Sequence, residues 1–150
     1  MDDLFQLLAA WLGSLGFAAL FCLRGKKLFY ASLGGLFSWG VYLFCARLSD
    51  SPYLCAFAAS VMLTFYSEIM ARVHKTPVTV FLVPAAIPLI PGAGLYRSVN
   101  DFMLREMELC AEQSLYTLQF AASMSAGITL TTLIFQIALG LLPRHRAKNP

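Results

Sequence analysis

One apolar stretch of the sequence, residues 76–96, combines residue types that can bind a small polar solute. Three prolines there each remove a backbone N–H donor, and two glycines relax the backbone just after them; the five residues are Pro84, Pro88, Pro91, Gly92 and Gly94. At membrane depth, carbonyls freed in this way are tolerated only where protein buries them or a watery cavity hydrates them. Freed carbonyls and exposed amides can bind the ammonium and carboxylate groups of a zwitterion. We therefore expect an unwound binding segment, with a kinked packing helix as the alternative.

A stripe of polar residues lies in the apolar run over residues 115–142. Hydroxyl and amide side chains recur there at i, i+4, i+7 and i+11, so they share one face of a helix; they are Ser125, Thr129, Thr132 and Gln136. Such side chains either hydrogen-bond a neighbouring helix, for roughly 0.6 to 2 kcal/mol each, or line the path of a polar solute. Both interpretations remain open, and the stripe is a candidate part of a solute pathway.

A shorter stripe of small and polar residues follows the spacing i, i+4, i+8 in an earlier apolar run and consists of Gly34, Ser38 and Tyr42. Small residues let two helices approach closely in a membrane. We favour close packing against another helix over the lining of a solute path.

Glu68 is the one acidic residue inside a predicted membrane span. An intramembrane carboxylate is costly, which makes Glu68 a candidate functional group, here as the carrier of a coupling proton. Arg72 follows four residues later, and a solvated ion pair at this spacing contributes only about 0.2 to 0.5 kcal/mol. We favour the solvated pair because Glu68 lies in the last turn before a basic loop.

For Arg97, just after the broken segment, we expect an ion pair with Asp101 rather than the binding of a carboxylate.

The remaining residues give little support for other chemistry. Both histidines lie in basic segments, and the sequence contains no zinc-protease motif, serine-hydrolase motif or phosphate-binding loop. The four cysteines show neither metal-binding nor disulfide spacing; the residues considered are His74, His145, Cys22, Cys45, Cys55 and Cys110. The basic residues form short clusters between apolar runs rather than a patch. We expect no enzymatic activity, no cofactor, no metal and no nucleic-acid partner.

Composition indicates that a lipid bilayer surrounds these residues. Hydrophobic residues make up 59% of the chain, charged residues 13%, and the mean hydropathy is +0.69, values typical of an integral membrane protein. We predict an all-α polytopic membrane protein, a single integral membrane domain over residues 1–150 with about five transmembrane helices of roughly 20 residues. The expected spans are residues 4–23, 28–45, 53–70, 78–95 and 115–142. The fourth is the Pro/Gly-broken helix, and the charged residues 97–114 are expected to form an amphipathic helix on the membrane surface.

The basic residues also predict the orientation of the chain, because cytoplasmic loops carry an excess of lysine and arginine. With five crossings, eight of the eleven basic residues fall on one side of the membrane. These eight are Arg24, Lys26, Lys27, Arg72, Lys75, Arg144, Arg146 and Lys148. We therefore expect the N-terminus outside and the C-terminus in the cytoplasm.

The run from Pro77 to Tyr96, with its Pro-Leu-Ile-Pro-Gly core, resembles the signature of the C-terminal half of the threonine/serine exporter family. The likeness extends more loosely over nearly the whole chain. It implies a multi-pass protein of the bacterial inner membrane that takes part in proton-driven export of small polar metabolites. The implied substrates are threonine or serine or, in some two-subunit relatives, a dicarboxylate such as succinate.

The resemblance also implies a partner. Family members that act as one chain carry an N-terminal half with about as many helices, so we expect a separately encoded membrane subunit resembling that half. A homo-oligomer is the alternative partner, and a non-transporting membrane scaffold is the alternative function. An aqueous cavity that reaches Pro88 and Thr129 would favour transport, whereas a tightly packed apolar interior would favour the scaffold.

Overall fold

The computed structural model describes residues 2–141, which form helices joined by short connections. In chain order these are α1 (Asp2–Leu20), α2 (Lys26–Leu48), α3 (Pro52–Val73), α4 (Thr79–Ala86), the 3₁₀ helix η1 (Ile87–Leu89), α5 (Gly92–Met103) and α6 (Met107–Leu141). Within this described range there is no β-strand. The predicted all-α class is confirmed.

Four of these helices, α1, α2, α3 and α6, are long and apolar enough to cross a membrane. The bent pair Thr79–Leu89 and Gly92–Met103, which meet at 52°, is the candidate for a fifth span. The expected broken helix is therefore present, and about five crossings fit the described part of the chain.

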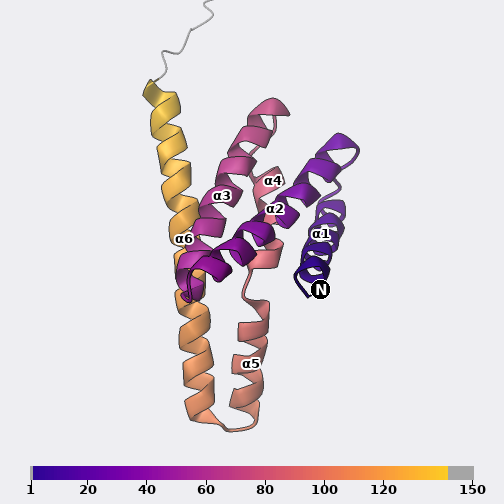
Figure 1. Ribbon diagram of the computed structural model, residues 1–150. Coiled ribbons are helices and arrows are strands. Elements are labelled where there is room, and N and C mark those ends of the chain that lie inside the picture. Colours follow the sequence, from indigo (N-terminus) through magenta and orange to yellow (C-terminus); the bar gives the residue numbers. More distant parts are fainter. Residues whose placement is uncertain (1, 142–150) are drawn as a thin grey trace, which may run out of the picture.

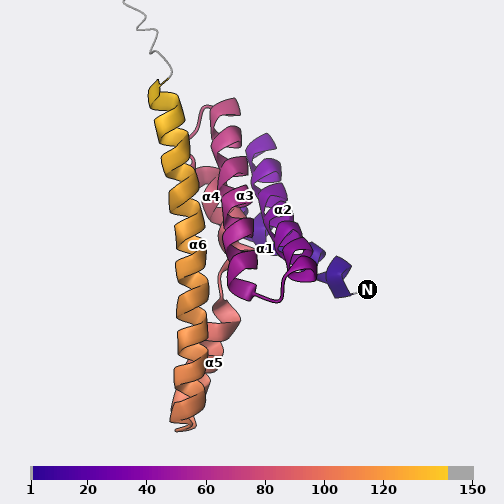
Figure 2. The ribbon, with the colours of Figure 1, turned by 60° about the vertical axis from the view of Figure 1, so that its left-hand side comes forward.

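The helices form a bundle with one long helix along its side (Figures 1 and 2). α6 packs along α3, and its first half packs against α5. Because α5 and the start of α6 extend beyond α1, α2 and α3, they form a projecting hairpin (Figure 1). The α1–α2 connection, the α3–α4 connection and the end of α6 lie on the opposite side from the tip of this hairpin.

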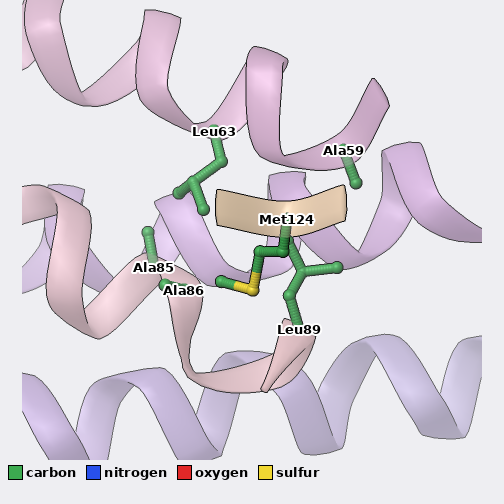
Figure 3. Close-up of a cluster of buried hydrophobic side chains, with 6 residues drawn as sticks. All are labelled: Ala59, Leu63, Ala85, Ala86, Leu89 and Met124. Atoms are coloured by element: carbon green, nitrogen blue, oxygen red, sulfur yellow. The ribbon is translucent and has the colours of Figure 1, made fainter. Parts of the chain in front are cut away.

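Small side chains dominate the core. One cluster joins α3, α4, η1 and α6 and is drawn in Figure 3; its members are Ala59, Leu63, Ala85, Ala86, Leu89 and Met124. Leu63, Leu89 and Met124 point toward one another there, and alanines fill the rest of the interface. Helices that meet through alanine approach closely, which increases the van der Waals contact that holds helices together inside a bilayer.

The break between α4 and η1 is supported by α2. The hydroxyl of Ser38 donates to the carbonyl of Ala85 at 2.8 Å, where the α-helix changes to 3₁₀ geometry just before Pro88. Gly34, one turn earlier on α2, faces the Cβ of Ala85 so closely that a side chain at that position would overlap it. The prediction that this stripe packs against another helix is confirmed, and its hydroxyl satisfies a backbone acceptor at the break.

The structure corrects the expected single helix over residues 97–114. α5 ends at Met103, and α6 begins at Met107 rather than at residue 115. The reason is the backbone of Arg105, whose φ of 61° is left-handed. The amide of Arg105 donates to Phe102 at 3.1 Å and that of Glu106 donates to Asp101 at 2.9 Å, a pattern that closes the end of a helix.

Candidate functional site

The broken segment lines a cavity of about 320 Å³ between α2, α5 and α6, which we call the aromatic pocket. Its polar and aromatic side chains come from three helices: Trp39 and Tyr42 of α2, Arg97 of α5, and Gln113, Tyr116 and Phe120 of α6. Residues 88–94 supply the backbone and small side chains of the remaining wall. A volume of this size matches the lower end of small-molecule sites.

Aromatic rings form a continuous wall of the pocket. Trp39 and Tyr42 stack with ring centroids 5.0 Å apart, and Tyr42 lies 6.0 Å from Phe120. Tyr116 continues the series at 6.3 Å from Phe120. The faces of such rings attract cations, an attraction that grows when water is excluded.

The groups of the pocket that attract anions come from α5. Among the described residues that line the pocket, Arg97 is the one charged side chain. α5 begins at Gly92 within the same wall, and no side chain caps its first turn. The first-turn amides of a helix attract anions. The pocket thus pairs an anion-binding side with an aromatic side.

Four of the five predicted residues of the broken segment line this pocket, namely Pro88, Pro91, Gly92 and Gly94. Pro84 does not line it and is fully buried inside α4. Pro88 also lines a second cavity of about 310 Å³, together with Gln6 and Ala10 of α1. The broken segment therefore lies between two cavities and lines both of them at Pro88.

The two glycines differ in their surroundings. A Cβ on Gly94 would overlap the Thr117 hydroxyl of α6, so this glycine allows α5 and α6 to meet. A Cβ on Gly92 would meet no heavy atom within 4 Å. Gly94 therefore serves the packing of the hairpin, whereas Gly92 keeps one side of the pocket wall open.

The structure does not bring the stripe of α6 to the pocket. Ser125, Thr129 and Gln136 are exposed on the outer face of the helix and Thr132 is half-buried. The inner face instead carries Met124, Gly127 and Thr131, all buried. Gly127 decides this rotation, because it meets Ser60 of α3 so closely that a Cβ would overlap the serine hydroxyl. The aromatic pocket reaches Pro88 but not Thr129.

Glu68 forms the predicted ion pair, with 2.6 Å between its Oε2 and Nη1 of Arg72. The expectation that the pair is solvated is wrong for Glu68, because only 4% of this residue's surface is exposed. Arg72 is more open, and its guanidinium lies 4.8 Å from the ring centroid of Phe135 on α6. α6 extends far enough to cover this end of α3, so the pair is closed from one side.

The expected pair of Arg97 with Asp101 is not formed. Ion pairs between described residues join Arg72 to Glu68 and Arg47 to Asp3. Arg97 lies along the wall of the aromatic pocket instead.

Sequence reasoning missed most of the pocket wall. Trp39, Gln113, Tyr116 and Phe120 come from segments that the prolines do not mark. The available signal was the spacing of Tyr116 and Phe120, which at i, i+4 share one face of a helix. Only the fold shows that this face meets Tyr42 of α2.

Comparison with protein-family models gives a match over most of the chain. The family model described as Threonine/Serine exporter, ThrE, covers residues 6–134. Comparisons with curated proteins and with solved structures found no match. The matched range includes the broken segment, the whole aromatic pocket and the Glu68–Arg72 pair. With its apolar helices, this chain is a multi-pass membrane protein that belongs to the threonine/serine exporter family, a family of transporters.

Proposed function

We propose that the chain is the membrane subunit of a two-component, proton-coupled exporter and that the aromatic pocket holds the exported solute. The observation that carries this proposal is the cavity at the broken helix, which Arg97 and the start of α5 line together with aromatic rings. Membrane transporters place solutes at helix breaks of this kind.

The pocket fits a small zwitterionic amino acid such as threonine or serine. Arg97 and the first-turn amides of α5 can hold the carboxylate. The faces of Trp39 and Tyr42 can hold the ammonium group. Gln113 remains for a side-chain hydroxyl. A dicarboxylate such as succinate is the alternative, but it needs a second cation that the described lining residues do not supply.

We further propose an inner-membrane location with the N-terminus outside and the C-terminus in the cytoplasm. The basic connections around Arg24 and Lys75 lie on the same side of the bundle, which supports this orientation. The test is a Glu108→Cys variant in a background without native cysteines. An impermeant thiol reagent should label it from outside; labelling only from the cytoplasm would reverse the orientation.

The proposed second component is a membrane subunit that resembles the N-terminal half of the family, with a homo-oligomer as the alternative. Its support is the exposed polar face of α6, because hydroxyl and amide groups that face lipid lack partners. A second polypeptide would cover this face and complete the wall of a solute path.

Efflux from reconstituted vesicles tests the proposed site. The chain is reconstituted with the candidate partner, and release of labelled serine or threonine is compared between wild type and Arg97→Gln. Loss of a charge-assisted contact should lower the rate about tenfold or more. Arg105→Gln is the matched control, since Arg105 is exposed at the hairpin turn.

Equal rates for wild type and Arg97→Gln would contradict the pocket assignment. A chain that binds its partner but moves no solute would instead support the scaffold function. Full efflux by the chain alone would exclude the two-component arrangement and leave self-association.

A further inference from the structure

A row of buried polar side chains runs along one face of α3. Its members are Ser60, Thr64, Ser67 and Glu68, spaced i, i+4, i+7 and i+8, and the three hydroxyl residues are fully buried. Each hydroxyl donates to a carbonyl of its own helix at 2.8 to 2.9 Å. The hydroxyls are therefore satisfied within α3, and the carboxylate at the end of the row is the one charged member.

The surroundings of Glu68 contain a single close charge. Arg72 on the same helix is its ion-pair partner. α4 carries no ionisable side chain, and α6 carries no charged residue between residues 113 and 138. At this end of α2 the ionisable groups are Lys26, Lys27 and Tyr30, and the Tyr30 ring lies 5.1 Å from that of His74. Among described residues, Arg72 alone lies within ion-pair distance of the carboxylate.

Such a pair is a poor source of stability. Removing a carboxylate and a guanidinium from water costs several kcal/mol per ion, a cost that their attraction only partly offsets. The side chain of Arg72 is 39% exposed, whereas that of Glu68 is 6% exposed. If a proton neutralises the carboxylate, the attraction ends, and the guanidinium can swing outward while the neutral acid stays buried.

We propose that Glu68 is the group that takes up and releases the coupling proton, with Arg72 as the counter-ion that holds it ionised between these events. This inference rests on the proton coupling in the proposed function. On uptake, an O–H bond forms on the carboxylate with a proton from a hydronium ion, which becomes water, and the ion pair opens. On release, that bond breaks, the proton passes back to water, and Arg72 pairs with the carboxylate again.

Two transport measurements on the reconstituted two-component protein separate this role from a structural one. The first is export driven by a pH gradient, and the second is exchange of labelled for unlabelled solute without a gradient. Glu68→Gln should lower gradient-driven export at least about tenfold and leave exchange within about twofold of wild type. Asp3→Asn is the matched control, because Asp3 forms the exposed pair with Arg47.

Infrared difference spectra of the purified protein give a readout that needs no transport. Titration should show the carbonyl band of a buried protonated carboxyl group in wild type and Asp3→Asn, but not in Glu68→Gln. If gradient-driven export survives in Glu68→Gln, or the band persists in that variant, the inference is overturned and the exporter proposal stands. If the band behaves as expected but no variant moves solute, the exporter proposal fails while proton uptake by Glu68 is retained.

Discussion

The stripe on α2 and the stripe on α6 have similar residue types and similar spacing but opposite surroundings. The α2 stripe is used within the chain: Gly34 and Ser38 meet Ala85 of α4, and Tyr42 lines the pocket. The α6 stripe, residues 125–136, points away from α3 and is largely exposed. Spacing therefore identifies a face that needs a partner, whereas only packing decides whether that partner lies in the same chain.

The largest expected effect comes from filling the α2 contact. Gly34→Leu should lower the free energy of unfolding by about 3 kcal/mol, because overpacking forces α2 and α4 apart at the break. Thr129→Leu on the α6 stripe is the control and should change stability by no more than about 0.5 kcal/mol. Thermal unfolding in detergent measures both. Equal losses would mean that the α6 stripe is as tightly packed as the α2 stripe.

An intermediate effect is expected from the hydroxyl groups. Ser38→Ala leaves the carbonyl of Ala85 without this donor, which should cost about 1 to 3 kcal/mol. Ser125→Ala removes an exposed hydroxyl and should be close to neutral in the isolated chain. Denaturant titration of the two variants measures the difference. A neutral Ser38→Ala would mean that another donor, such as water, reaches the break.

Substitutions in the α6 stripe should have the smallest effect on the stability of the chain. They should instead weaken binding of the partner subunit. Thr129→Leu combined with Gln136→Leu should lower copurification of the partner subunit about tenfold, through loss of interhelical hydrogen bonds. Thermal stability of the chain alone should stay unchanged. Leu130→Ala, exposed on α6 outside the stripe, is the control. Undiminished copurification would assign the partner contact to another face.

Much of the fold is predictable because apolar length and proline content act locally. Helix number, the break after Pro84 and the family likeness of residues 77–96 all follow from such signals. Helix ends are harder to predict. Two residues after the ends of α1, α3 and α5, the backbone is left-handed at Cys22, Lys75 and Arg105, although glycine is the usual signal for this conformation.

Only one wall of the aromatic pocket can be predicted from the sequence. The prolines and glycines of the broken segment mark their own wall of the pocket, since they act on the backbone that contains them. The other wall depends on how α2 and α6 turn about their axes. That rotation is set by contacts distant in sequence, such as Gly127 against Ser60. An isolated helix pattern favours the polar stripe as the inner face, and close packing at Gly127 overrides it.

The unbroken length of α6 has a structural consequence. In its first half, Phe120 forms part of the pocket wall, and further along the same helix the ring of Phe135 lies 4.8 Å from the guanidinium of Arg72. These two rings are about 22 Å apart along the axis at 1.5 Å per residue. The helix between these two rings has no break, so the two places are joined by a single regular backbone. One continuous helix therefore carries both a wall of the aromatic pocket and the ring beside Arg72.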